Sequence, residues 1–335
     1  PTEFELKLYI NGKKYIYQLI LSPKDILSEK LHVYNSNQPS LLMHRELVDS
    51  NTALKFNQSL IKVSAAVKDE LTAKCLKNMS LFAARKAVNC NLGEIDDVRD
   101  WMINHTLPVI DLGQKMFNYA ERNMLENPDA KKHLLDFCHN IGFNIEDMAV
   151  EKDYMSLTPE MIQFIKSSGQ LSDENASKLS KDPKMPNGFK TDFIVSVINK
   201  RGKEIYTLPK ASQSEGTLRA MGIETALYVA EQNNKLLPID EIETSMHPLL
   251  LKFMIQSFLK VQSRSQLLLT THYDPLFTAV DDYLRKDSFW LMDKRDDGHS
   301  ELYPLISKNG VNKMRSLQRA YLNNKLGALP QIANV

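Results

Sequence analysis

The feature that most constrains this chain is a short apolar run, Leu236–Ile239, followed directly by two acids, Asp240 and Glu241. A short apolar run bounded by polar residues predicts a buried strand. Two carboxylates at the end of such a strand suit metal and water chemistry on a nucleotide, because one can orient a phosphate-bound Mg²⁺ and the other can position an attacking water. Asp240 takes the first role in this interpretation and Glu241 the second.

Two other motifs flank this strand: Ser214-Glu215-Gly216-Thr217 upstream and Thr270-Thr271-His272 downstream. Each motif has an ordinary structural explanation: a solvated strand end, a helix cap, or a hydrogen-bonded surface histidine. Their order favours a functional one. A serine-glycine turn, a helix, an acid-ended strand of the Walker B type, a second helix and a histidine-ended strand are the layout of ABC-type ATPases.

The local sequence agrees with this order of elements. Apolar residues recur at helical spacing after Gly216, so the Ser-x-Gly-Thr turn is predicted at a helix N-terminus, which is a natural anion site. Asn233-Asn234 should end this helix. Met246-His247-Pro248 should open the next helix, with His247 as a helix-start residue rather than a catalytic one, and Leu267–Leu269 should form the strand that leads to His272.

The chain resembles a known family along nearly all of its length. The carriers of the resemblance are the three motifs, the run Asp240-Glu-Ile-Glu-x-Ser-x-His-Pro248, the ending Tyr321-Leu-Asn-Asn-Lys-Leu-Gly-Ala-Leu-Pro330 and the early block Tyr9-Ile-Asn-Gly-Lys-Lys-Tyr-Ile-Tyr17. These segments are similar to the ABC-type AAA ATPases of bacterial phage-defence and abortive-infection systems, above all the AbiLi/RloA-like proteins, with the ATPase subunit of the PARIS system as a near relative.

The resemblance implies an ATP-binding, Mg²⁺-dependent subunit that works as a head-to-tail homodimer or higher oligomer and controls a separate effector, possibly a nuclease. It implies Mg²⁺ coordination by Asp240, water positioning by Glu241 and a γ-phosphate contact by His272. Ser214, Glu215, Gly216 and Thr217 would bind the nucleotide held by the other protomer. Glu243 could pair with a cation, shape the turn or remain solvated.

One departure from the family pattern concerns the phosphate loop, because no Gly-x-x-x-x-Gly-Lys-Ser/Thr occurs in the sequence. Asn11-Gly12 between two alternating runs predicts a hairpin turn, so Lys13 and Lys14 belong to a strand. We therefore expect a preceding segment of about fifty residues or more, the size of a strand–loop–helix unit. A second departure is Pro238 inside the acid-ended strand, where the missing N–H requires an edge or a bulge.

The predicted fold is α/β: an ABC-ATPase head with a P-loop NTPase-like mixed sheet and an antiparallel lobe, interrupted by a helical insertion. We place the N-terminal lobe at residues 1–94, the insertion at 95–190 and the C-terminal lobe at 191–335. Strands are expected at Phe4–Ile10, Tyr15–Leu21 and Leu60–Val63, and again at Phe193–Val197 and Glu204–Leu208.

Within the insertion, helical patterns are expected from Val98 to Ile110, at Lys131–Ile141, and from an N-cap at Thr158 to a stop at Gly169. Residues 170–190 look like a polar connector. Proline and glycine punctuation argues against a long coiled-coil arm and for a compact helical lobe. The lobe could dock a second subunit or an effector, or simply pack as a lid.

Composition sets bounds on the class of protein. The 335 residues are 43% hydrophobic, with a net charge of +1 and three cysteines. The near-neutral charge gives no support to a broad nucleic-acid footprint, although local DNA contact stays open. Three cysteines suggest a reduced, cytoplasmic setting, and no apolar run approaches the roughly twenty residues of a membrane span.

Two alternatives to a defence switch remain open at this point. One is an ATPase in DNA repair or DNA processing, similar to the SMC, RecF or overcoming-lysogenization-defect proteins. The other is a nucleotide-dependent scaffold that does not hydrolyse ATP, which the presence of Glu241 argues against.

Overall fold

The protein is a mixed α/β chain that divides into two compact units, residues 1–106 and 107–335. The computed structural model describes residues 1–168, 172–280, 282–295 and 297–329. Unit 1 is built on a five-stranded antiparallel sheet in the order β1-β2-β3-β4-β5. Its strands are β1 Thr2–Ile10, β2 Lys13–Leu21, β3 Ile26–Tyr34, β4 Ser40–Val48 and β5 Asn51–Phe56. Its helices are α1 Ala65–Lys74, α2 Leu81–Ala84 and α3 Glu94–Asn104.

The predicted hairpin is confirmed, since Ile10 pairs with Lys13 across the Asn11-Gly12 turn. One face of the sheet supplies Leu31, Val33 and Met43 to a core that helices α1 to α3 complete. The strand expected at Leu60–Val63 is wrong. The backbone N–H groups of Leu60 and Ile61 both donate to the carbonyl of Asn57, which winds this segment into a turn.

A buried polar pair ties the sheet of unit 1 to its helices. Glu29 and Arg45 are both fully buried. Glu29 accepts the Leu81 N–H at the start of α2 and the Tyr17 hydroxyl, while Arg45 donates to the carbonyls of Leu76 and Lys77. Because nearly all of these groups find partners, the cost of burying two charges is offset by hydrogen bonds. Burial nevertheless raises the pKa of Glu29.

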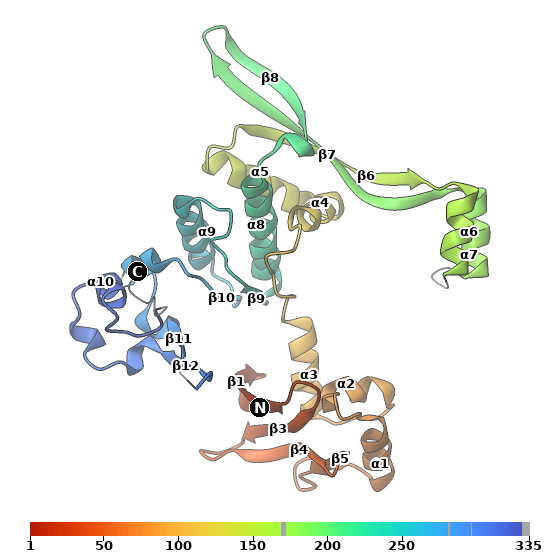
Figure 1. Cartoon of the computed structure of the whole chain (residues 1–335), viewed down its shortest axis with the longest axis vertical. Coiled ribbons are helices and arrows are strands. Elements are labelled where there is room, and N and C mark those ends of the chain that lie inside the picture. The colour runs from red at the N-terminus through yellow and green to blue at the C-terminus, as the bar shows by residue number, and fades with distance from the viewer. Residues whose placement is uncertain (169–171, 281, 296, 330–335) are drawn as a thin grey trace. The chain divides into compact units, whose positions relative to one another are not determined.

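Unit 2 is organised around a long, central helix that packs against three others and beside two parallel strands (Figure 1). The helix is α8, Glu215–Asn233, and its neighbours are α4 Phe117–Glu126, α5 Pro128–Asn140 and α9 Pro248–Lys260. The parallel strands are β9 Leu236–Ile239 and β10 Gln266–Leu269. The predicted helix–strand–helix–strand order is confirmed, with Ser214 as the N-cap of α8 and His247 as the N-cap of α9.

The helical pattern expected from Val98 to Ile110 is only partly correct. Helix α3 ends at Asn104, and residues 107–110 run extended beside β9, where Ile110 forms a parallel bridge with Ile239. Pro108 explains the break, because the residue before a proline disfavours the helical region. The Leu107 N–H donates to the Leu236 carbonyl, and the Ile110 N–H donates to the Pro238 carbonyl. An advance of three residues along this segment therefore matches an advance of two residues along β9. This bulge-like mismatch accommodates Pro238, which has no N–H to donate.

Residues 95–190 are not wholly helical, which corrects the expected insertion. They contain β6 Ile145–Ser156 and part of β7 Lys184–Asn199, which pair antiparallel, and β8 Gly202–Pro209 then pairs with the other edge of β7. The supposed connector holds helix α7, Asp173–Lys181, and the start of β7. Thr158 is confirmed as the N-cap of α6, Pro159–Ser167, whereas Gly169 lies outside the described residues. The sequence carries no clear signal for β6, because this strand is largely polar and is exposed along most of its length.

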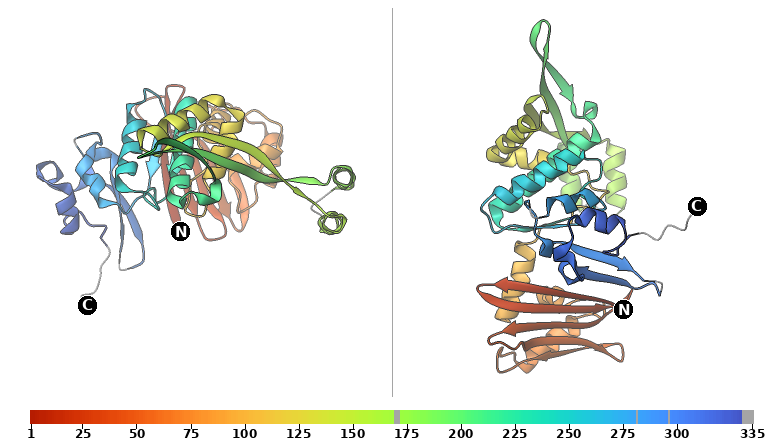
Figure 2. Two further views of the ribbon diagram at one scale, coloured as in Figure 1. Left: turned by 90° about the horizontal axis from the view of Figure 1, so that it is seen from above. Right: turned by 90° about the vertical axis from the view of Figure 1, so that its left-hand side faces the viewer.

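We call the β6–β7 ribbon together with α6 and α7 the arm. The two helices lie at the far end of the ribbon, and the β7–β8 hairpin extends the other way (Figures 1 and 2). The chain continues after β10 into a small C-terminal group around β11 Trp290–Lys294, β12 Ser300–Pro304 and α10 Leu317–Leu322, which share their own hydrophobic cluster. Within the described residues, no helix has both the length and the apolar character needed to cross a membrane.

Helix α8 packs so closely on α4 that one position tolerates no side chain. A Cβ added to Gly222 would lie 2.4 Å from the carbonyl carbon and 2.5 Å from the Cβ of Met116. We predict that Gly222→Ala lowers the free energy of unfolding by about 1–3 kcal/mol, despite the better helix propensity of alanine. Denaturant unfolding measures the change.

Gly113→Ala is the matched control for this substitution, because a Cβ there meets only Asp111 Oδ1 at 3.6 Å, an ordinary contact. Equal stability changes for the two variants would show that the α4–α8 approach is not tight.

Candidate functional site

The candidate site is built where two neighbouring parallel strands end. Strands β9 and β10 pair in register from Leu236↔Gln266 to Ile239↔Leu269. The residues that follow, Asp240 and Thr270, therefore emerge at the same edge of the sheet, because parallel strands share their direction. The Thr270 N–H donates to the Ile239 carbonyl at 3.0 Å, which continues the pairing up to the polar residues.

The hydroxyl of Thr270 holds the two acids that follow β9. It donates to Asp240 Oδ1 and accepts the backbone N–H of Glu241 at 2.9 Å. The Ile242 N–H donates back to the Thr270 carbonyl at 3.3 Å. Thr270 therefore fixes both the Asp240 carboxylate and the peptide that presents Glu241. The sequence motif contained Thr270 but gave no reason to assign it this role.

Glu243 joins the same two loops from the other side. Its carboxylate accepts the Thr271 hydroxyl at 2.6 Å and the His272 N–H at 2.7 Å. Of the three roles considered for Glu243, the structure supports the shaping of the turn. His272 itself stays open, with its side chain 87% exposed and Nε2 at 3.9 Å from Glu241 Oε1. The predicted trio of Asp240, Glu241 and His272 is thus gathered at one edge.

A third segment reaches this edge from residues 107–111. The Asp240 N–H donates to the Ile110 carbonyl at 2.8 Å, so the first acid is fixed by its backbone as well as by its side chain. Sequence reasoning missed this contribution, because it assigned Ile110 to a helix. Pro108 is the local signal that could have corrected the assignment.

The Ser214–Thr217 turn lies against the loop that follows the acids. Ser214 caps α8 by accepting the Thr217 N–H at 3.1 Å. A Cβ on Gly216 would lie 2.3 Å from the Ser245 carbonyl oxygen, so only glycine permits this approach. Glu241 and Ser245 both have left-handed backbone angles, with φ of 45° and 60°. Such angles cost free energy in non-glycine residues, and the surrounding hydrogen bonds must maintain them.

An arginine is buried beneath this turn. Arg219 is 7% exposed, and its Nη1 makes one long hydrogen bond of 3.4 Å to the Asp111 carbonyl. Its Nε and Nη2 atoms have no partner in the described structure. Burial lowers the pKa of Arg219, while the nearby carboxylates of Asp111, Glu215 and Glu241 act in the opposite direction. The positive charge therefore lies close to the acids without a direct ion pair.

The donor set limits what metal the site could hold. Among the described residues, no three His, Cys, Asp or Glu side chains gather into a metal-binding group. Asp240 offers a single carboxylate, whose Oδ2 accepts no hydrogen bond from any described residue. One carboxylate fits Mg²⁺, which commonly takes one or two protein carboxylates and completes its shell with phosphate and water.

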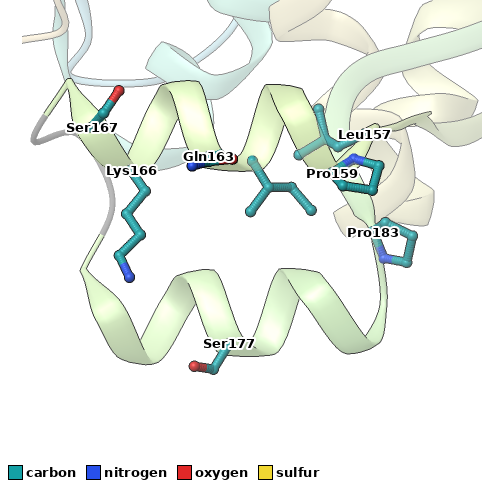
Figure 3. A pocket seen from close by; sticks show the side chains of 8 residues that line it. Leu157, Pro159, Gln163, Lys166, Ser167, Ser177 and Pro183 are labelled. Carbon is teal, nitrogen blue, oxygen red and sulfur yellow. The ribbon is translucent and has the colours of Figure 1, made fainter.

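A separate pocket of about 730 Å³ lies in the arm, between α6 and α7 (Figure 3). Its lining is largely apolar on one side, with Leu157, Pro159 and Ile162, and polar on the other, with Gln163 and Lys166. It shares no residue with the strand-end site. The chemistry suggested by the sequence therefore belongs to the exposed strand ends and not to this pocket.

Comparison with models of protein families assigns the chain to a family. A family model described as "AAA domain, putative AbiEii toxin, Type IV TA system" matches residues 1–278. The chain therefore belongs to this AAA domain family, whose members are expected to bind nucleotide, and the mixed α/β fold agrees with this assignment. A search among curated proteins finds no match.

We predict that Thr270→Val loosens the acid-bearing loop without unfolding the protein. The variant keeps the shape of the side chain but removes the hydroxyl that binds Asp240 and the Glu241 N–H. Because Thr270 is exposed, the loss of stability should be about 1 kcal/mol or less. Amide hydrogen exchange at residues 240–243 should become faster. Thr278→Val, which removes only a local bond to the Pro275 carbonyl, should leave that exchange unchanged.

Proposed function

We propose that this AAA-domain protein is the Mg²⁺-dependent, ATP-hydrolysing subunit of a bacterial antiphage defence system of the abortive-infection or toxin–antitoxin kind. In this proposal it acts as a nucleotide-controlled dimeric switch for a separate effector such as a nuclease. The observation that carries the proposal is the strand-end cluster, in which Thr270 fixes Asp240 and Glu241, with His272 Nε2 3.9 Å from Glu241. The resemblance to the AbiLi/RloA-like proteins and to the PARIS ATPase supports the finer assignment.

The proposed chemistry divides among the residues at the sheet edge. A bound Mg²⁺ would neutralise charge on the ATP phosphates. The Asp240 carboxylate would hold the ion through a water molecule, and the Thr270 bond to Oδ1 would keep the carboxylate oriented. Glu241 would accept a proton from the attacking water. His272 is exposed enough to donate a hydrogen bond to the terminal phosphate.

The serine-glycine turn would act on a nucleotide held by a second copy. Ser214 is exposed and Thr217 half-buried at the N-terminus of a 19-residue helix, where backbone N–H groups and the helix dipole favour an anion. Glu215 and Gly216 complete this turn. The proposal requires a Gly-x-x-x-x-Gly-Lys-Ser/Thr loop in addition, which the family resemblance places ahead of the β1–β2 hairpin.

We predict that Glu241→Gln lowers ATP turnover by about two to four orders of magnitude, because the amide cannot accept the proton of the attacking water. Nucleotide binding should persist, and the protein should accumulate as a closed dimer or larger assembly. The measurements are the ATPase rate and the assembly size of the protein that includes its phosphate loop. Glu126→Gln, at an exposed position on α4, is the control. Unchanged turnover in Glu241→Gln would refute the proposed role and would favour the non-hydrolysing scaffold.

Asp240→Asn should have a different effect, because an amide is a much weaker ligand for Mg²⁺ than a carboxylate. We predict weaker binding of Mg²⁺-ATP, measured by titration with a fluorescent nucleotide, and little change in the binding of nucleotide in EDTA. Equal losses with and without Mg²⁺ would contradict a metal role for Asp240.

The action of the turn across the dimer can be tested by mixing two inactive variants. Glu241→Gln disables the acid of each site, and Ser214→Arg blocks each turn. If the turn serves the partner's nucleotide, a mixed dimer contains one site with an intact acid and an intact turn. We expect the mixture to recover part of the wild-type ATPase rate. No recovery despite proven formation of mixed dimers would mean that the turn acts within its own protomer.

A further inference from the structure

A fully buried carboxylate lies between the arm and the Ser214–Thr217 turn. Glu121, on α4, is 0% exposed. Its Oε1 accepts the hydroxyl of Thr191 on β7 at 2.6 Å, and its Oε2 accepts Lys210 Nζ at 2.8 Å. A buried carboxylate is tolerated only when its oxygens are paired, so losing either partner is strongly unfavourable. The three residues therefore move together or not at all.

Lys210 fixes the chain just ahead of the turn. Its Nζ also donates to Asn118 Oδ1 at 2.9 Å and lies 5.2 Å from the centre of the Phe117 ring. Lys210 begins the short 3₁₀ helix Lys210–Ser212, and its carbonyl accepts the Gln213 N–H at 3.1 Å. Ser214, the N-cap of α8, follows at once. Lys210 therefore links α4 to the short segment that leads into α8.

Thr191 marks the base of the arm. It is 1% exposed and pairs with Val150 on β6, whereas the residues further along both strands toward α6 and α7 are mostly exposed. Phe193 lies two residues after Thr191 on β7, in the direction away from α6 and α7. It is buried, and 5.6 Å separates the centre of its ring from that of Phe117. The ribbon is therefore anchored at this point and free beyond it (Figures 1 and 2).

We propose that Glu121 is a positioning residue that couples the arm to the Ser214–Thr217 turn. A displacement of the ribbon at Thr191 also displaces the Glu121 carboxylate, because this buried group must keep its hydrogen bonds. Lys210, which is bonded to the same carboxylate, then moves with it. The start of α8 then shifts against the Ser245 carbonyl, where Gly216 leaves no spare room. The loop that carries Glu241 belongs to this same contact region. Regulation of ATP hydrolysis through this link rests on the proposed function.

The register of the arm allows its end to be removed cleanly. Ser156 pairs with Lys184, so an Asn-Gly turn can replace residues 157–183 and close the ribbon as a hairpin. We call this variant the short-arm protein. The experiment is a double-mutant cycle between the short arm and Glu121→Gln in the full-length protein, with kcat and KM for ATP as readouts. Glu126→Gln on the same helix is the control.

We expect the short arm to change kcat by about five-fold or more in the wild-type background, the usual range for coupled sites, with a smaller change in KM. In the Glu121→Gln background the short arm should have no further effect. In the Glu126→Gln background its full effect should remain. Provided that the wild type hydrolyses ATP, the proposal is overturned if the short arm leaves its kcat unchanged, or if the short arm changes kcat by the same factor in all backgrounds.

A second pair of variants covers the case in which Glu121→Gln does not fold. Thr191→Val removes the hydroxyl that binds Glu121, and Thr191→Ser retains it. The valine variant should abolish the short-arm effect and the serine variant should preserve it; equal behaviour of the two would refute the link.

Amide hydrogen exchange at residues 210–218 separates this inference from the proposed function. Exchange there should become faster in the short-arm, Glu121→Gln and Thr191→Val proteins, and not in Thr191→Ser or Glu126→Gln. If no form hydrolyses ATP but exchange follows this pattern, the proposed function fails and the link stands. If ATP is hydrolysed but exchange at the turn is the same in all variants, the link fails alone.

Discussion

The bonding of β9 along both of its edges is the constraint on which the rest of the site depends. The carbonyl of Ile239 accepts the N–H of Thr270, the residue that follows β10, and the carbonyl of Pro238 accepts the Ile110 N–H from the opposite side. Because both neighbours run parallel to β9, all three segments end at one edge. Asp240 follows Ile239 directly, and its own N–H donates to the Ile110 carbonyl, so it has fixed neighbours on each side.

Hydrogen bonds between the loop that follows β9 and the loop that follows β10 hold the site in place. Thr270 binds the acids after β9, and Glu243 in turn binds the residues after β10. This reciprocal arrangement explains how Glu241 keeps a left-handed backbone angle at a half-buried position. Preorganised carboxylates need little rearrangement when substrate binds, which is what a water-positioning acid requires.

Helix α8 connects this edge to the remainder of unit 2. Close approaches at Gly216 and Gly222 seat it against Ser245 and Met116, and most of its middle residues are buried. A helix packed this tightly moves as a rigid body if it moves at all. Its N-terminal turn contacts the acid-bearing loop, and the preceding Lys210 contacts the base of the arm through Glu121. Helix α8 is therefore linked both to the acid-bearing loop and to the base of the arm.

The sequence by itself determined the features that depend on near neighbours in the chain. Ser214, Thr158 and His247 cap helices by bonding to N–H groups two or three residues away, and Asn11-Gly12 turns the chain between adjacent strands. The order of turn, helix and acid-ended strand could likewise be predicted from the sequence, because each element lies within one continuous segment.

Only the tertiary structure decided which distant segments meet. Ile110 was assigned to a helix, but its carbonyl accepts the N–H of Asp240, which lies 130 residues later in the chain. The sequence could not predict this contact, because a parallel pairing between distant segments leaves no local pattern. Strand β6 and the first part of β7 were missed because exposed ribbons carry few apolar residues at the spacing of two, whereas the part of β7 at Phe193–Val197 was predicted. Glu121 reads as one more polar residue on an amphipathic helix. Its burial follows from Thr191 and Lys210, and those partners come together only when the arm and α8 have folded around α4.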